Sequence, residues 1–343
     1  RTKTKDGQGT SVLKKKANVL QKEIFSESLG KNIQLPIVAY YGTGRLWNMR
    51  KFFSEEKDEN SLSRTYGYRG CLDSSSTFKY FAEWYTQIFK SYRDAQIIAL
   101  EKNIDNIEEI TKRFIPIKVV QNSINAVITK HTGWKDIRYS TQENDLTLCN
   151  DTLGELSVDQ LSDGIRNIFA VVADIAYRCL LLNPSLGEEA ALKTSGIVLI
   201  DEIDMHLHPS WQQTILEDLK QAFPAIQFIV TTHSPQVISS ISSKNIQILE
   251  DGIIYDAPYG TEGAESSRIL KSIFNVESRP PQNKYTKILM RYQELAYSDK
   301  WDTYEAKELR KMLNEKYRGE EPLLKEIDLH IENRKWELGY ENN

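Results

Sequence analysis

Two carboxylates come directly after an apolar run in the segment GIVLIDEID at residues 196–204. The run from Ile197 to Ile200 is short and rich in β-branched side chains, which favours a strand buried on both faces of a parallel sheet. Asp201 would then lie at the carboxyl end of the strand, where such sheets bind ligands, and Mg²⁺ prefers one or two carboxylates with phosphate and water oxygens. Glu202 beside it could polarise an attacking water. Alone, the pair could equally cap and begin a helix.

A histidine follows the next apolar run, Ile226 to Val230, within the segment TTHSP at residues 231–235. Because the carboxyl ends of parallel strands meet at one edge of a sheet, His233 should lie near the two acids. Phosphoryl transfer needs mainly positioning and neutralisation of charge, so a metal, a base and a polar contact to the γ-phosphate would suffice. The two strand ends together favour a catalytic site over a helix cap.

A helix should join these two strands, because apolar residues recur between them at every fourth position. They are Trp211, Ile215, Leu219 and Phe223. Gln212 and Gln213 fall on the polar face of this helix, and Pro224 ends it. Strand, helix and strand then form a right-handed βαβ unit of a doubly wound sheet.

A third motif, LSDGIRN, lies upstream at residues 161–167. Ser162 is a suitable N-cap for a helix whose buried stripe includes Ile165 and Phe169. A helix N-terminus beside a glycine such as Gly164 is also an anion site, because unpaired N–H groups and the helix dipole point at the ligand. Capping alone would explain the motif equally well.

In this order, LSDGIRN, IVLIDEID and TTHSP resemble the signature, Walker B and switch-histidine motifs of ABC-type ATPases such as RecF and the SMC proteins. The resemblance implies an α/β P-loop ATPase head with a doubly wound, mainly parallel sheet, an antiparallel β layer, a helical insertion and a C-terminal helical region. It also implies that Asp201 is the Mg²⁺ carboxylate, Glu202 the catalytic base and His233 the sensor of the ATP γ-phosphate.

The same resemblance implies a homodimer. In this superfamily the signature motif contacts ATP held by a second subunit, so Ser162, Asp163 and Gly164 would complete the partner's site in a head-to-tail dimer. His208 falls in the dimer-facing D-loop, where many ABC-type proteins have an aspartate, and the pattern DEIDxHLHP is typical of defence and repair ATPases allied to OLD proteins. His206 and His208 alternate like metal ligands, but no nearby third His or Cys completes a zinc set, so interface contacts are favoured.

The flanking segments Pro36 to Trp47, Arg64 to Asp73 and Arg279-Pro280 extend the resemblance to PtuA-type ATPases of Septu and retron-associated antiphage systems. That family implies a PtuB-like HNH endonuclease partner, which would contact DNA for the complex, and in retron systems a reverse transcriptase with its RNA–DNA hybrid. The chain has no HNH cluster and no acidic Toprim set, so we expect an ATPase that is not itself a nuclease.

One motif of this superfamily is missing. No GxxxxGK[ST] sequence occurs, and residues 7–10 lack both the lysine and a preceding apolar strand. Residue 1 is Arg, and in the family a Walker A strand and helix precede the segment that residues 1–11 resemble. We therefore expect a chain that begins downstream of its own P-loop rather than a degenerate ATPase.

Composition places the chain in the cytoplasm. Its three cysteines are scattered, which argues against a disulfide framework, no apolar stretch is long enough for a membrane span, and no signal peptide is visible. The net charge of −4 gives no overall signature of nucleic-acid binding. A basic cluster near the N-terminus is more typical of a solvated face; it comprises Lys3, Lys5, Lys14, Lys15 and Lys16.

Four regions are expected: the end of an N-terminal ATPase lobe (1–74), a helical insertion (75–133), the ATPase core (134–265) and C-terminal helices (266–343) that either dock a partner or pack on themselves. The favoured function is an ATPase that controls the HNH nuclease. A regulatory scaffold that binds ATP with little turnover, and a RecF- or SMC-like DNA repair ATPase, are the alternatives. The insertion is too short for a long coiled coil, which counts against the repair ATPase.

Overall fold

The computed structural model describes residues 8–25, 33–46, 63–73, 78–102 and 107–339. Contacts within the chain divide it into two compact units, Arg1–Ser242 and Ser243–Asn343. Trp47 and two lysines of the basic cluster, Lys3 and Lys5, lie outside the described residues. The other lysines of the cluster lie on the helix α1 (Gln8–Phe25).

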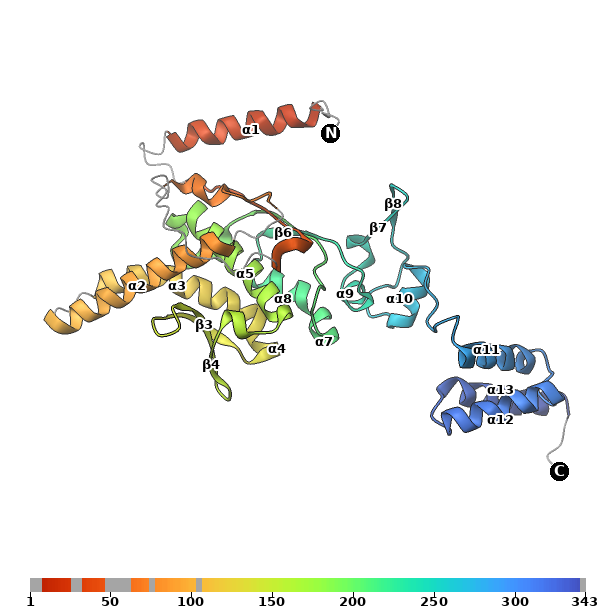
Figure 1. The fold of residues 1–343 in the computed structure, drawn as a ribbon. Helices are drawn as coiled ribbons and strands as arrows, with labels where there is room; N and C mark the ends of the chain where they lie inside the picture. Colours follow the sequence, from red (N-terminus) through yellow and green to blue (C-terminus); the bar gives the residue numbers. More distant parts are fainter. Residues whose placement is uncertain (1–7, 26–32, 47–62, 74–77, 103–106, 340–343) are drawn as a thin grey trace. The chain divides into compact units, whose positions relative to one another are not determined.

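The first unit contains a three-stranded parallel sheet (Figure 1). Its strands are β1 (Ile37–Tyr41), β5 (Gly196–Ile200) and β6 (Ile226–Val230), in the order β1-β5-β6. The last residues of all three strands pair side by side, so their carboxyl ends form one edge. The two apolar runs are therefore neighbouring parallel strands, as predicted.

The prediction that the run Ile197 to Ile200 is buried on both faces of the sheet is wrong, and its neighbour β6 is also exposed on one face. Val198 and Ile200 are buried, whereas Ile197 is 41% exposed and Ile229 is 49% exposed. Side chains alternate between the two faces of a strand, and only the face that contains Val198 joins the main core. An all-apolar run therefore did not indicate two covered faces.

The antiparallel layer is a meander of three strands that leads into the most buried helix. The strands are β2 (Lys135–Ser140), β3 (Asp145–Asn150) and β4 (Gly154–Ser157), and they form the antiparallel layer that the resemblance implied. A short 3₁₀ turn (Val158–Gln160) then leads to α5 (Asp163–Leu182). Most side chains of α5 are buried, including Phe169 and Val172 at 0% exposure.

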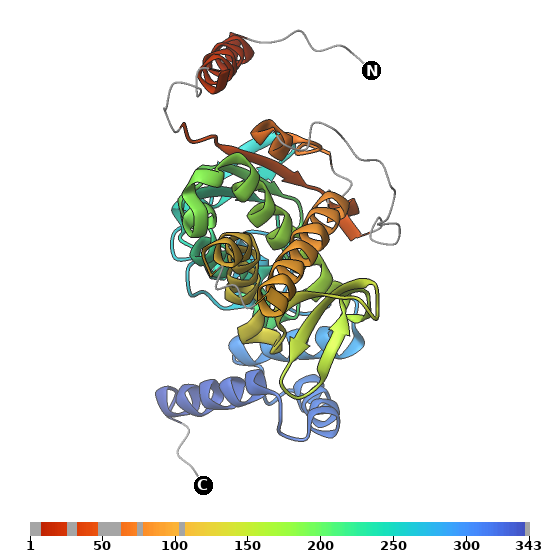
Figure 2. The ribbon, with the colours of Figure 1, turned by 90° about the vertical axis from the view of Figure 1, so that its left-hand side faces the viewer.

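The predicted helical insertion consists of α2 (Phe78–Lys102) and α3 (Ile107–Ile124), which run side by side (Figures 1 and 2). It is not separate from the core, because Phe81 and Ile117 are fully buried in the main apolar cluster. The ring of Phe81 packs edge-on against that of Phe169, with 6.4 Å between their centroids.

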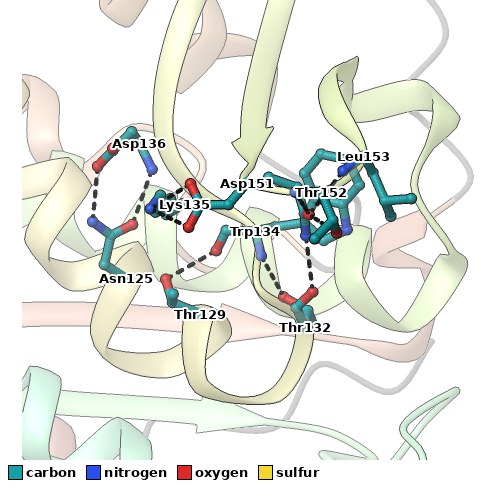
Figure 3. Close-up of polar contacts among 10 residues, drawn as sticks. Asn125, Thr129, Thr132, Trp134, Lys135, Asp136, Asp151, Thr152 and Leu153 are labelled. Carbon is teal, nitrogen blue, oxygen red and sulfur yellow. Dashed lines mark hydrogen bonds and ion pairs between the residues drawn. The ribbon is translucent and has the colours of Figure 1, made fainter.

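A π-helical turn (Asn125–Thr129) and α4 (Lys130–Thr132) connect the insertion to the antiparallel layer (Figure 3). The amide of Asn125 exchanges two hydrogen bonds with Asp136, both 3.1 Å long. The Thr129 hydroxyl donates to the carbonyl of Trp134 at 2.9 Å. These bonds fix the position of the intervening residues, among them His131.

The helix predicted between β5 and β6 is broken into α7 (Pro209–Gln212) and α8 (Ile215–Ala222). Thr214, between them, has φ −125°, outside the helical range. Its hydroxyl lies 3.0 Å from Asp218 and 3.1 Å from the His131 ring, and such side-chain bonds compete with the helical backbone pattern. The apolar periodicity continues across the break and could not reveal it.

The second unit begins with a hairpin of β7 (Gln247–Glu250) and β8 (Ile253–Asp256), and its two turn residues, Asp251 and Gly252, both have positive φ. The helices α10 (Ser266–Ser272), α11 (Lys284–Tyr297), α12 (Tyr304–Tyr317) and α13 (Pro322–Glu337) follow. The last three share their own apolar core, so these C-terminal helices do pack on themselves.

Residues 243–265, which the sequence placed with the ATPase core, group by contacts with the second unit. The four predicted region boundaries otherwise stay predictions. Within the described part of the chain, no helix is both long enough and apolar enough to cross a bilayer.

Candidate active site

The predicted acids and histidine follow neighbouring strands at the carboxyl edge of the parallel sheet. Asp201 and Glu202 follow β5, and the segment that contains His233 follows β6. The backbone ladder continues beyond the strands: the Asp201 N–H donates to the Tyr41 carbonyl at 2.8 Å, and the Thr231 N–H donates to Ile200 at 3.0 Å. Asp201 and Glu202 are half-buried and His233 is exposed, so all three side chains lie at an accessible edge.

Thr231 holds both acids in place. Its hydroxyl donates to Oδ1 of Asp201 and accepts the Glu202 N–H at 2.9 Å. Glu202 has φ +49°, a left-handed conformation that is uncommon for a residue with a side chain and is often found at functional sites. No role was expected for Thr231 from the sequence; its hydroxyl near the histidine, one strand away from the acids, was the available signal.

A second set of hydrogen bonds joins the histidine segment to residues 204–208, the segment that the resemblance to ABC-type ATPases assigns to the D-loop. The Thr232 hydroxyl donates to Oδ1 of Asp204. The Ser234 hydroxyl donates to Oε1 of Gln212 at 2.7 Å, and Nε2 of Gln212 donates to the Leu207 carbonyl at 2.9 Å. Gln212 was expected on a polar face and is instead half-buried between two loops.

The predicted signature residues begin α5. Ser162 occupies the N-cap position, but its side chain makes no capping bond, so the prediction of a serine cap is wrong in that respect. Arg166 pairs with Asp163, and its hydrogen bond lowers the pKa of the Asp163 carboxyl. An exposed serine hydroxyl at a helix N-terminus fits contact with a phosphate.

The signature segment packs directly against the D-loop of the same chain. A Cβ atom on Gly164 would lie 2.3 Å from the carbonyl oxygen of His206, so only glycine fits there. The Asn167 amide also donates to the Met205 carbonyl at 3.2 Å. A displacement of the D-loop would therefore change its contacts with the start of α5.

Ser162, Gly164, His206 and His208 line one cavity of about 250 Å³ together with His131 and Trp211. His131 was missed in the sequence, because it lies outside every motif; its ring stacks on Trp211 with 5.1 Å between centroids. Nδ1 of His208 accepts the Ser210 N–H at 3.3 Å and caps α7. Among the described residues, no group of three His, Cys, Asp or Glu side chains is arranged to hold a metal ion.

The candidate residues thus form two groups. Asp201, Glu202 and His233 lie at the sheet edge, whereas the lining of the cavity contains Ser162 and His208 and none of those three. Residues 203–208 run from one group to the other. Their catalytic, metal-binding and nucleotide-binding roles stay predictions.

Comparison with known proteins identifies the family. Residues 44–239, more than half of the chain, match the family model described as AAA domain, putative AbiEii toxin, Type IV TA system. The chain belongs to this family. It is 34% identical to the probable ATPase of retron Ec83 from Escherichia coli over 93% of its own length, and 30% identical to that of retron Vc95 from Vibrio cholerae over 83%.

A Septu protein PtuA from Bacillus thuringiensis is 29% identical over 42% of the chain. These relatives confirm the predicted PtuA-type ATPase family of Septu and retron defence systems. The chain spans 66% and 62% of the lengths of the two retron ATPases.

Two solved structures of SMC proteins are also similar. One, from work on ATP-driven dimerisation and DNA-stimulated activation of SMC ATPases, has a TM-score of 0.30 at 15% identity and covers 41% of this chain and 84% of that one. The other, an SMC head bound to the C-winged helix domain of ScpA, has a TM-score of 0.31 at 16% identity, with 44% and 45% covered. The predicted α/β class, with a parallel sheet, an antiparallel layer and added helices, is confirmed by the elements themselves.

Proposed function

We propose that this chain carries the metal-and-base half of an ATPase site in an antiphage defence complex. The observation that carries the proposal is the edge formed by Asp201, Glu202 and His233, with Thr231 bonded to both acids. The carboxylate of Asp201 supplies the hard oxygen donor that Mg²⁺ prefers, and its bond to Thr231 fixes its orientation. Bound Mg²⁺ would neutralise charge on the phosphates of ATP.

Glu202 is the proposed general base. Its backbone N–H is fixed by Thr231, and the next residue, Ile203, donates to the Thr231 carbonyl at 3.1 Å, so the left-handed turn is held on both sides. The side chain would accept a proton from the water that attacks the γ-phosphate. His233, at the end of the neighbouring strand, would contact that phosphate from the other side.

A head-to-tail dimer is the second part of the proposal. The signature residues at the start of α5 belong to a separate group from the acids; they are Ser162, Asp163 and Gly164, with His208 nearby. This separation supports the proposal that they contact ATP held by a second copy of the chain. Three further proposals rest on the family alone. The chain would control a PtuB-like HNH endonuclease and contact DNA through that complex. With a retron, it would also associate with a reverse transcriptase and its RNA–DNA hybrid.

Glu202→Gln in the full natural chain tests the catalytic assignment. We expect normal ATP binding with turnover about 10²- to 10⁴-fold lower, the range for loss of a general base. Glu217→Gln, an exposed acid on α8, is the matched control and should turn over ATP like the wild type. Undiminished hydrolysis by Glu202→Gln would contradict the assignment.

The dimer is tested by Ser162→Arg, which should bind ATP as a monomer and fail to hydrolyse it. Hydrolysis at the normal rate by a monomeric variant would exclude a composite site. Wild-type turnover that neither the nuclease nor DNA stimulates would instead favour a scaffold that binds ATP structurally.

A further inference from the structure

Gln212 contacts the histidine segment and the D-loop at the same time. Its Nε2 donates to the carbonyls of Leu207, at 2.9 Å, and Asp204, at 3.4 Å, while its Oε1 accepts the Ser234 hydroxyl at 2.7 Å. Both N–H hydrogens and the carbonyl oxygen of the amide are therefore used. All these partners lie outside α7, the helix that Gln212 ends, so the side chain joins three segments.

The direction of the Ser234 bond is fixed by its surroundings. Ser234 is buried, and its oxygen accepts the N–H groups of Gln236, at 3.1 Å, and Val237, at 3.3 Å, as the N-cap of α9 (Pro235–Ser239). Its single hydrogen is then left to donate, and Oε1 of Gln212, at 2.7 Å, is closer than that of Gln236, at 3.3 Å. A displacement of the segment beside His233 would therefore strain or break the bond to Gln212.

His233 lies between two residues that hold the D-loop. Thr232, before it, bonds to Asp204, and Ser234, after it, reaches Leu207 through Gln212. At its other side the D-loop touches the start of α5, where Gly164 leaves no room for a Cβ atom. The contacts form a continuous path from His233 to the cavity that contains Ser162.

We infer that Gln212 is a positioning residue that couples the histidine segment to the D-loop, so that the phosphate state at one ATP site alters the signature surface presented to the other. This inference rests on the proposed ATPase function. Contacts alone do not measure coupling, so the test is energetic and kinetic. A residue that only stabilises the fold would change the melting temperature; a coupling residue changes turnover and cooperativity between sites.

The test compares Gln212→Met with Gln213→Met in the full natural chain. Methionine keeps the length of the side chain and removes both donor and acceptor, and Gln213 is the exposed neighbour. For Gln212→Met we expect kcat about tenfold lower, a KM for ATP within about twofold, a Hill coefficient that falls to about 1, and a Tm only a few degrees lower, because the hydrogen bonds of the amide are lost. Gln213→Met should match the wild type in all four.

Ser234 provides a second arm. Ser234→Ala should reproduce the loss of kcat, Ser234→Thr should restore it because the hydroxyl remains, and the double variant Gln212→Met with Ser234→Ala should be no worse than either single variant. Additive losses, an equal loss in Gln213→Met, or a wild type without cooperativity would overturn the coupling.

The failure of the coupling can be told apart from the failure of the proposed function. Without nucleotide, Gln212→Met should speed hydrogen exchange of D-loop amides such as those of Met205 and Leu207, which are bonded in the wild type. Unchanged exchange would overturn the coupling whatever the ATPase assays show. Normal turnover in Glu202→Gln would overturn the catalytic assignment alone.

Discussion

Tyr41 joins two hydrogen-bond networks that differ in burial. Inside the core its phenol donates to Oδ2 of Asp174 at 2.8 Å, and Arg178 pairs with the same oxygen at 2.7 Å, with both charged side chains only 2% exposed. At the sheet edge its carbonyl accepts the Asp201 N–H, among half-buried or exposed groups. Burial, and to a lesser extent Asp174, raises the pKa of Tyr41 well above its usual value, so the phenol stays a donor.

Polar groups in the two networks serve different purposes: those in the core stabilise the fold, and those at the sheet edge position acids for a ligand. In the core network the protein supplies the partners: Arg178 also donates to the carbonyls of Gly67 and Arg69. Removing either charged side chain of the Asp174–Arg178 pair leaves the other buried and unpaired, which lowers the stability of the fold. At the sheet edge, polar groups hold the acids where a ligand can reach them. Removing one of these polar groups should therefore lower the rate of ATP turnover.

The largest expected effect comes from Asp174→Asn. The Arg178 guanidinium would stay buried without its carboxylate, and we expect the free energy of unfolding to fall by about 3–5 kcal/mol. Urea unfolding of the purified chain measures this. Tyr41→Phe, which removes one hydrogen bond and leaves the ion pair, should cost only about 1 kcal/mol. An Asp174→Asn loss no larger than the Tyr41→Phe loss would show that the buried ion pair stabilises the fold no more than a single hydrogen bond does.

Thr231→Val tests the edge network. The substitution keeps the side-chain shape and removes both bonds, so Asp201 and the Glu202 backbone lose their shared anchor. We expect kcat for ATP to fall about 10- to 100-fold with a nearly unchanged melting temperature, and Thr231→Ser, which keeps the hydroxyl, to restore most of the rate. A variant that melts early yet turns over ATP normally would assign Thr231 to the fold instead.

The same difference explains what could be predicted from the sequence. Asp201 and His233 were placed correctly because short apolar runs that end in polar residues report both a strand and its carboxyl end. His131 was missed because its partner Thr214, which ends the expected helix early, lies 83 positions away. Gln212 was expected on a polar face because its bond to Ser234, 22 positions away, leaves no trace in the helical periodicity. Local periodicity carries no information about such contacts.

Exposure of the sheet face was missed for a similar reason. The composition of a strand such as Ile197 to Ile200 fits two buried faces, but coverage is decided by which other elements pack there. The order of motifs was more informative than the composition of any one of them, and it led to the family that residues 44–239 match.

An ion pair in the second unit allows a further test of how burial sets the contribution of charged groups to stability, with a smaller expected effect. Arg279 forms two bonds, of 2.7 Å and 3.1 Å, with Glu321, and Glu321 also accepts the Leu323 N–H at the start of α13. The Arg279 hydrogen bond lowers the pKa of the Glu321 carboxyl. Unlike the core pair, Arg279 has a side chain that is 35% exposed, so part of the interaction is screened by solvent.

Glu321→Gln should therefore destabilise the second unit by only about 1 kcal/mol at pH 7. Because the folded pKa is below the unfolded value of about 4.3, the stabilisation is complete above that pH and is lost as the pH falls through the folded pKa. The gap between wild type and variant should close in acid, as followed by urea unfolding between pH 7 and 2. Glu320→Gln, its exposed neighbour, should show no gap at either pH, and a Glu321 gap that persists in acid would show that packing, not charge, holds this end of α13.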